Sequence, residues 1–120
     1  MSNTSSGSER LKFIKEQKVK FNHCDFAGIV FYPRFFEMLN ELVEDWFDEA
    51  LGYSFLKMHP NNGVPTADIK IKFKSPARLG DILKKELWIV TISDRSITYA
   101  YQFTQNETIV LEGTAVIVNV

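Results

Sequence analysis

One long amphipathic segment constrains the fold of this chain more than any other feature. Apolar residues recur at three- and four-residue spacing between Pro33 and Gly52, which predicts a helix with one broad apolar face. The stripe comprises Phe35, Phe36, Leu39, Leu42, Val43, Trp46, Phe47 and Ala50. Pro33 suits the first helical position, and Gly52 suits the position just past the end. The chain must therefore bury this stripe against another element.

The rest of the chain is rich in strand patterns that can cover the helix. Ile69, Ile71 and Phe73 alternate with three lysines, which predicts a strand with one apolar face. Strands are predicted at residues 14–21, 68–74, 82–93, 96–104 and 108–120. The connections between the last three strands are short, so these three should be antiparallel neighbours. We expect an α+β domain in which a curved antiparallel sheet of about five strands packs against one long helix.

Length, charge and cysteine content narrow the class of protein. A chain of 120 residues fits a single domain, which we place at residues 11–120 after a flexible, serine-rich arm at 1–10. The 14 basic residues balance 15 acidic ones, which gives no electrostatic reason to expect nucleic acid or a membrane as partner. A single cysteine excludes an internal disulfide, and two distant histidines predict no metal site. The polar start predicts no secretion signal or membrane span, so we expect a cytoplasmic protein.

The segment 22–33 joins the first predicted strand to the helix and carries the best candidates for chemistry. Asp25 is a potential base or nucleophile, and Gly28 allows the backbone to approach a ligand closely. The first N–H groups of a helix lack intrahelical partners, and the positive end of the helix dipole faces this loop. The segment therefore holds both halves of an acyl-transfer site, a base or nucleophile and an oxyanion donor. In a plainer interpretation, Asp25 caps a turn and Gly28 supplies a positive φ.

The same residues resemble a known family. Residues 25–33, Asp-Phe-Ala-Gly-Ile-Val-Phe-Tyr-Pro, resemble the D-x-A-G-x-V-x-Y-P signature of hotdog-fold acyl-CoA thioesterases of the 4-hydroxybenzoyl-CoA thioesterase type. Residues 73–81 resemble the sheet segment and turn of that family, and Gly113 falls within what resembles its last strand. The resemblance extends from about Ile14 to Val120. It implies a hotdog fold, in which the sheet wraps a central helix, and hydrolysis of an acyl-CoA thioester.

The resemblance also implies roles for individual residues. The matching aspartate, Asp25, either attacks the thioester carbonyl or activates water, and Gly28 lets the loop approach the thioester. The implied oxyanion donor is the backbone N–H of Tyr32. Coenzyme A belongs to the substrate, so no cofactor or metal is expected. The family further implies a homodimer or homotetramer with sites at the subunit interface.

Two residues beside Asp25 require separate interpretations. His23 departs from the family, in which the position two before the aspartate is often acidic. If the backbone there is extended, His23 points to the same side as Asp25 and either tunes it, orients it, or is a half-buried spectator. Cys24 then points to the opposite side, which makes a Cys-His-Asp triad geometrically poor.

Further candidate contacts lie outside the motif. Asn40, at the edge of the helix stripe, is either a polar contact at the acyl end of the pocket or a boundary residue. Arg95 and Ser96 occupy a position where the family often carries a basic residue and a serine, so Arg95 is the candidate for the phosphates of coenzyme A. The lysines of the 68–74 strand are by default a solvated face. His59 lies in a turn-rich loop and should be solvated.

The charge of the helix and its lack of histidine bear on assembly and on rival functions. Its exposed positions carry six acids against Arg34, so we expect that this face does not pack against its own copy in any tetramer. A hotdog dehydratase or hydratase is one rival. Such enzymes are expected to carry a motif that contains histidine, followed by an acidic residue on the helix, and this helix has no histidine. A domain that binds acyl-CoA without hydrolysing it is the rival outside catalysis.

Overall fold

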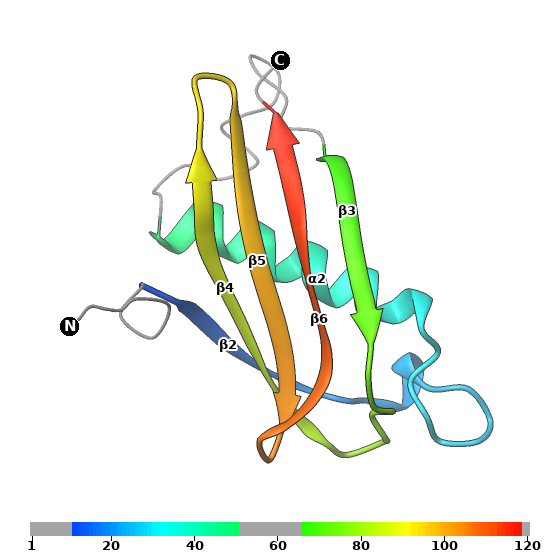
Figure 1. Cartoon of the computed structure of the whole chain (residues 1–120). Helices are drawn as coiled ribbons and strands as arrows, with labels where there is room; N and C mark the ends of the chain where they lie inside the picture. The colour runs from blue at the N-terminus through cyan, green and yellow to red at the C-terminus, as the bar shows by residue number, and fades with distance from the viewer. Residues whose placement is uncertain (1–10, 51–65, 119–120) are drawn as a thin grey trace.

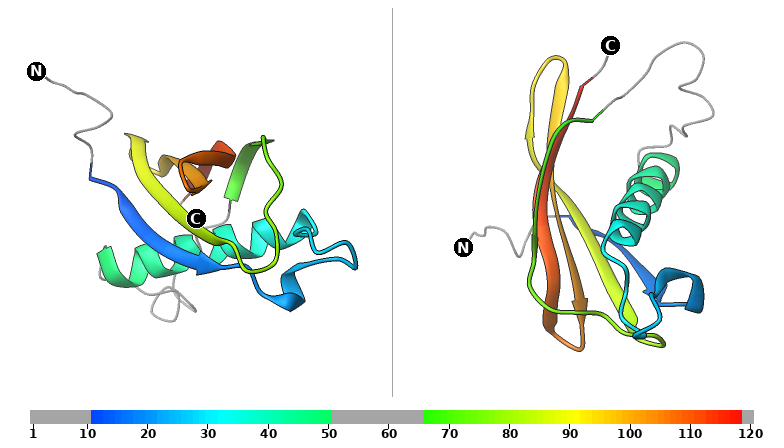
Figure 2. Two further views of the ribbon diagram at one scale, coloured as in Figure 1. Left: turned by 90° about the horizontal axis from the view of Figure 1, so that it is seen from below. Right: turned by 90° about the vertical axis from the view of Figure 1, so that its right-hand side faces the viewer.

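The computed structural model describes residues 11–50 and 66–118, which form one antiparallel sheet with a helix across one face (Figures 1 and 2). The strands are β2 (Phe13–Lys18), β3 (Thr66–Phe73), β4 (Ile82–Ile92), β5 (Ser96–Gln105) and β6 (Thr108–Val118). Their order in the sheet is β2-β4-β5-β6-β3. The helix α2 (Pro33–Asp45) continues into a π-helical turn, η2 (Trp46–Ala50). The predicted α+β hotdog fold, with five strands and one long helix, is confirmed.

The predicted apolar stripe of the helix forms half of the core. Phe35, Leu39, Leu42, Val43, Trp46 and Phe47 are buried, together with Met38. The facing side of the sheet contributes Leu83, Leu87, Tyr99, Tyr101, Phe103 and Leu111. Phe36 lies at the edge of the stripe and stays 37% exposed. Each fully buried side chain of this kind contributes about 1.5–3 kcal/mol, so the stripe holds the helix on the sheet.

The first strand is shorter than its sequence pattern predicts. β2 ends at Lys18, and Phe21–His23 form a single 3-10 turn, η1, rather than an extension of the strand. The His23 imidazole stabilises this turn, because its Nδ1 accepts a 2.9 Å hydrogen bond from the Lys20 N–H. Local side-chain bonding of this sort competes with sheet pairing. As a result Phe21 is 84% exposed instead of facing the core.

The helix keeps its predicted start but changes geometry near its end. Pro33 is the first helical residue, as predicted, and Tyr32 is the N-cap. The π-helical turn after Asp45 widens the last part, where Trp46 and Phe47 are both buried with their rings 5.3 Å apart. The predicted stop at Gly52 lies outside the described residues, as do the arm at 1–10 and His59.

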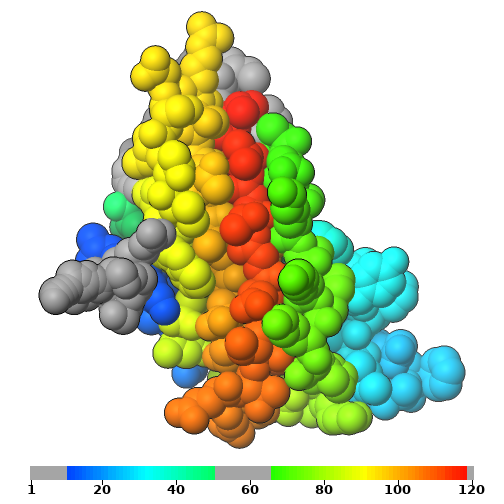
Figure 3. Space-filling model, in the orientation of Figure 1, coloured from blue at the N-terminus to red at the C-terminus, as the bar shows by residue number. Residues whose placement is uncertain are grey.

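Strand β3 forms an open edge of the sheet. It pairs with β6 on one side, and no other described strand pairs with its second side. The predicted alternation is present, but Ile69 is 40% exposed and Phe73 is 46% exposed because nothing in the described chain covers that edge. Lys70 and Lys72 are exposed on the sheet face that points away from the helix, which Figure 3 views directly. The edge is a feature that globular proteins normally cover.

Candidate active site

A tight hairpin, residues 24–30, presents Asp25. Cys24 and Val30 form an antiparallel bridge, and the Asp25 N–H donates a 3.1 Å hydrogen bond to the Ile29 carbonyl oxygen. The Gly28 N–H donates to the Asp25 carbonyl oxygen at 3.0 Å, with Gly28 at φ +79°. This is a three-residue hairpin loop that needs a left-handed residue at its end, which glycine provides. The predicted turn role of Gly28 is therefore confirmed.

The carboxylate of Asp25 has one local partner and is otherwise open. One oxygen, Oδ1, accepts a 2.9 Å hydrogen bond from the Ala27 N–H, which is an Asx turn. The side chain is exposed, and Oδ2 has no partner among residues 11–50 and 66–118. A carboxylate held at one oxygen and open at the other can accept a proton or attack an electrophile. In the single chain, Asp25 is not among the residues that line the hollow beside Tyr32.

An unpaired backbone donor lies at the start of the helix. The N–H groups of Val30, Phe31, Arg34 and Phe35 all donate to carbonyl oxygens, and Pro33 has no N–H. The N–H of Tyr32 has no acceptor among the described residues. It is therefore the free donor of this turn, at the positive end of the helix dipole. The arrangement can stabilise negative charge that develops on a bound oxygen.

His23 and Cys24 have structural contacts rather than catalytic geometry. The condition of an extended backbone at residue 23 is not met, because His23 ends the 3-10 turn η1 and its Nδ1 is bonded to the Lys20 N–H. The Cys24 thiol lies 3.6 Å from the Lys20 carbonyl oxygen, to which it can donate. Partial burial raises the pKa of the Cys24 thiol, and the charges of Asp25 and Asp81 raise it further. Such a thiol is a poor nucleophile near neutral pH.

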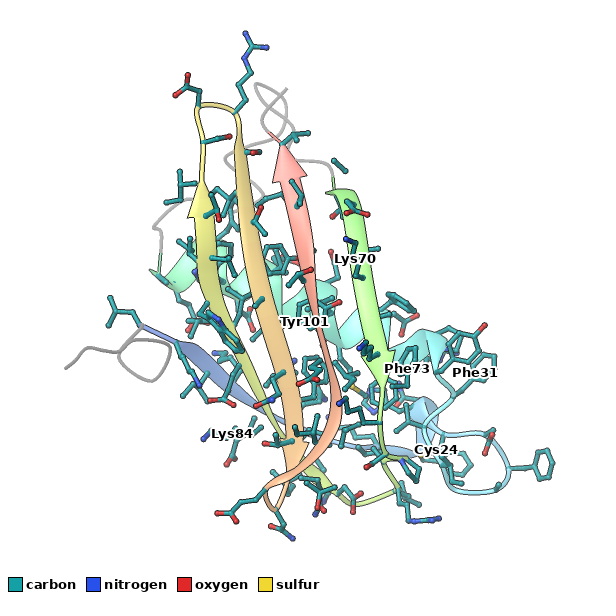
Figure 4. All side chains as sticks on the ribbon, viewed as in Figure 1. Cys24, Phe31, Lys70, Phe73, Lys84 and Tyr101 are labelled. Atoms are coloured by element: carbon teal, nitrogen blue, oxygen red, sulfur yellow. The ribbon has the colours of Figure 1, made fainter. Side chains whose placement is uncertain are left out.

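An aromatic hollow of about 300 Å³ lies beside Tyr32. It is lined by Val30, Tyr32, Phe35, Phe73, Lys74, Ser75 and Pro76. The Phe73 ring lies 5.9 Å from the rings of both Tyr32 and Phe35, and Figure 4 shows Phe73 beside Phe31 at this end of the sheet. The sequence pattern predicted that Phe73 lies on the apolar face of its strand, but it did not predict this hollow. The sequence does contain one signal for the position of Tyr32 beside the hollow, because Pro33 at the first helical position makes Tyr32 the N-cap.

The remaining predicted contacts lie apart from Asp25 within one chain. Asn40 is exposed on α2. Arg95 and Ser96 lie at the β4–β5 connection, at the far end of the sheet from the hairpin loop (Figure 1). The start of β4 adjoins the loop, since the Leu79 N–H bonds to the Gly28 carbonyl oxygen, and the 11-residue strand then spans about 35 Å. The Ser96 hydroxyl is 2.7 Å from that of Ser93, within the turn.

The described part of the chain contains neither a cluster of metal ligands nor a helix able to span a membrane. Among residues 11–50 and 66–118, no group of three or more His, Cys, Asp or Glu side chains is placed to hold a metal ion. No described helix combines the length and apolar character needed to cross a membrane.

The family model that matches this chain, a curated relative and two solved structures are all named as thioesterases, thioesterase-like proteins or CoA hydrolases. The model of the thioesterase-like superfamily matches residues 19–120. A 1,4-dihydroxy-2-naphthoyl-CoA hydrolase from Synechocystis sp. is 29% identical over 96 residues, which cover 79% of this chain and 70% of that protein. The crystal structure of a 1,4-dihydroxy-2-naphthoyl-CoA thioesterase from Synechocystis aligns with TM-score 0.82 and 25% identity, over 91% of this chain and 82% of that one. A gentisyl-coenzyme A thioesterase structure aligns with TM-score 0.82 and 25% identity, over 89% and 87% of the two chains.

These similarities cover the parts of the molecule described above. The family match begins at Val19, just after β2, and therefore includes the hairpin loop, the helix and the other four strands. The structural neighbours align over nearly the whole chain, which shows that they share its helix-on-sheet arrangement. The chain therefore belongs to the thioesterase-like superfamily and is a hotdog-fold thioesterase, as the resemblance of its Asp25–Pro33 motif to acyl-CoA thioesterases predicted.

Proposed function

We propose that this protein hydrolyses an acyl-CoA thioester to a carboxylic acid and coenzyme A, with Asp25 as nucleophile or general base. In the first case the carboxylate attacks the thioester carbonyl and coenzyme A leaves as the thiolate, which takes a proton from water; water then hydrolyses the mixed anhydride. In the second case the carboxylate takes a proton from water as that water attacks, and the proton passes to the thiolate as coenzyme A leaves. The support is a motif aspartate with one open oxygen on a hairpin fixed by three hydrogen bonds.

The observation that carries this proposal is the unpaired Tyr32 N–H. Both routes put negative charge on the former carbonyl oxygen, and a backbone donor at a helix start can stabilise that charge. Loss of one such donor typically costs about a hundred- to a thousand-fold in rate. Of the backbone groups from Val30 to Phe35, Tyr32 alone keeps its N–H free among the described residues. At its own position in the loop, Gly28 leaves the approach of the thioester free of a side chain.

A second copy of the chain would complete the site. Asp25 is exposed in the single chain, and the open edge of β3 carries the partly exposed side chains of Ile69 and Phe73. Antiparallel pairing of two β3 edges would join the sheets of two chains around a twofold axis. The rotation would also bring the partner's β4–β5 connection to the end of the sheet that carries this Asp25. Arg95 and Ser96 are therefore assigned to coenzyme A bound at the other chain's loop, and Asn40 to the acyl side.

The relatives and the aromatic hollow favour an aromatic acyl group. The relatives reported above are named as enzymes acting on naphthoyl and gentisyl thioesters of coenzyme A. The hollow beside Tyr32 is lined by rings that can pack against a planar group. A panel of aryl and aliphatic acyl-CoAs, followed by release of free thiol, would determine the preferred acyl group.

Substitution of Asp25 by asparagine tests the proposed function. Asparagine retains a side-chain oxygen for the Ala27 N–H, so the Asx turn should survive while the base or nucleophile is lost. We expect turnover to fall by about 100-fold to 10,000-fold, with coenzyme A binding and thermal unfolding almost unchanged. Asp81→Asn is the matched control, because the Asp81 Oδ2 accepts a 2.9 Å bond from the Arg78 N–H in an adjacent loop. Near-normal turnover of Asp25→Asn would refute the assignment.

A further inference from the structure

Phe26 is a large apolar side chain that is fully exposed. Its relative exposure is 105%, the highest among the large hydrophobic residues that the structure describes. Full exposure of an aromatic ring is unusual, because folding normally removes such rings from water. A contact that the single chain does not contain is the simplest reason to retain this ring at the surface.

The ring is held away from its own chain by the geometry of the hairpin. Phe26 is the second residue of the turn that the Gly28 N–H closes on the Asp25 carbonyl oxygen at 3.0 Å. The Ala27 N–H is bonded to Asp25 Oδ1 at 2.9 Å, so the backbone on both sides of Phe26 is fixed. The side-chain direction therefore follows from the turn. The turn thus fixes the Cα–Cβ direction of Phe26, and its ring is fully exposed.

The position of the loop identifies what the ring can reach. The segment that carries Phe26 protrudes past the β3 edge of the molecule, as Figure 3 shows in light blue and cyan at the lower right. That edge is where a second chain is proposed to complete the site. The Cα atom of Phe26 is about 3.8 Å from that of Asp25, the distance between consecutive residues. A thioester carbonyl within attack distance of the Asp25 carboxylate, about 3–3.5 Å, would therefore lie close to the residue that carries this ring.

We propose that Phe26 is a specificity-determining residue whose ring packs against the acyl group of the thioester that reacts at Asp25. This inference rests on the proposed function. The ring supplies an apolar wall on the open side of the site, and it favours thioesters with a bulky planar acyl group over those with a small one. A two-carbon acyl group is too short to cover the ring, so it gains little from the contact. Phe26 contacts the substrate but takes no part in proton transfer or bond formation.

Steady-state kinetics of Phe26→Ala with two substrates test this role. We expect KM for benzoyl-CoA to rise about tenfold or more, because contact with an apolar group binds ground state and transition state alike. For acetyl-CoA we expect a change in kcat/KM of less than about twofold, since the lost contact is small. Phe26→Leu retains apolar bulk, so its KM for benzoyl-CoA should lie between those of wild type and Phe26→Ala. Phe21→Ala is the matched control, because Phe21 is also 84% exposed but does not adjoin Asp25.

Other outcomes of the same experiment would overturn the inference. An equal loss for both substrates would mean that Phe26 contacts coenzyme A or only supports the loop. Unchanged kinetics for both would mean that it contacts no substrate. A fall to the mass of one chain in light scattering would identify Phe26 as a subunit contact instead. If Asp25→Asn is inactive and Phe26→Ala behaves as wild type, only this inference fails, whereas an active Asp25→Asn variant refutes the proposed function itself.

Discussion

The ring of Tyr101 lies over Gly113 of the neighbouring strand. Its hydroxyl donates a 2.8 Å hydrogen bond to the carbonyl oxygen of Lys70 (both residues are labelled in Figure 4). The three residues belong to β5, β6 and β3, so the phenol crosses β6 and fastens the edge strand. Gly113 faces Tyr101 on one side and Ile71 on the other in the sheet register. Burial raises the pKa of Tyr101, which keeps the hydroxyl protonated as a donor. This hydrogen bond therefore fixes β3, the strand proposed to pair with a second chain, to the core of its own sheet.

Gly113→Ala should destabilise the protein by about 1–3 kcal/mol, the usual cost of overpacking. An added Cβ would collide with the Lys70 carbonyl oxygen and would lie 2.6 Å from the Tyr101 hydroxyl oxygen. Urea unfolding measures the change. Thr114→Ala is the control, because the exposed neighbouring residue points to the other face of the sheet, and it should shift the midpoint little. Equal stability of Gly113→Ala and wild type would contradict the packing described for Tyr101.

Gly28→Ala should lower stability through backbone strain alone. A Cβ at Gly28 would meet nothing within 4 Å, but φ is +79°, a conformation that costs an L-residue about 1–2 kcal/mol. Gly28→Asn should lose less, because asparagine adopts the left-handed region more readily. Thermal unfolding of the three proteins should therefore rank them glycine, asparagine, alanine. The opposite order of the two variants would argue against the hairpin geometry.

Lys85 should make stability depend on pH in the alkaline range. It is 3% exposed, and its Nζ donates to the Met38 carbonyl oxygen and to Gln17 Oε1, both at 3.2 Å. Burial lowers the pKa of Lys85, while Glu41 and Asp45 partly oppose that shift. The unfolded chain therefore holds the proton at a pH where the folded chain has lost it. Unfolding free energy attributable to Lys85 should rise with pH from the folded pKa up to that of unfolded lysine, about 10.4.

Lys85→Met isolates that contribution from the other titrating groups. The difference in unfolding free energy between wild type and Lys85→Met should move in favour of wild type as pH rises from the lowered pKa of folded Lys85 towards that of unfolded lysine, about 10.4. Urea denaturation at a series of pH values gives this difference directly. A difference that stays constant, or moves in favour of the variant, would show that the ammonium group is stabilised rather than penalised by burial.

Ile69→Lys should weaken association of two chains if β3 is the subunit contact. Ile69 is 40% exposed at the open edge, and a buried charge there would be costly. We expect light scattering to show a shift towards the mass of one chain on dilution, together with loss of thioesterase activity. Glu44→Lys introduces the same residue on the exposed face of the helix. It should leave the mass unchanged, in keeping with the expectation that this acidic face does not meet its own copy.

Residue patterns predicted the structure best where a single local preference, such as helical spacing or strand alternation, decides the conformation. Helical spacing and the proline at its start predicted α2 from Pro33, and alternation predicted the strands of the sheet. The same rules overextended β2 to residue 21, because the bond between His23 and the Lys20 N–H depends on how a turn folds. They placed Phe73 on the apolar face of its strand but did not predict that it stays 46% exposed, because a period of two identifies a face of the sheet and not whether a further strand covers it.

The sequence by itself determined the helix, the strands, the family motif and the aspartate and glycine of the candidate site. These features depend on residue type and on spacing within a few turns of chain, where sterics and hydrogen-bond geometry act locally. Only the tertiary structure decided that the Tyr32 N–H stays free, that Tyr101 crosses Gly113 to reach Lys70, and that Arg95 lies at the far end of the sheet from Asp25. Such relationships join residues that are distant in sequence, and they are set by strand order and packing, which no local pattern encodes.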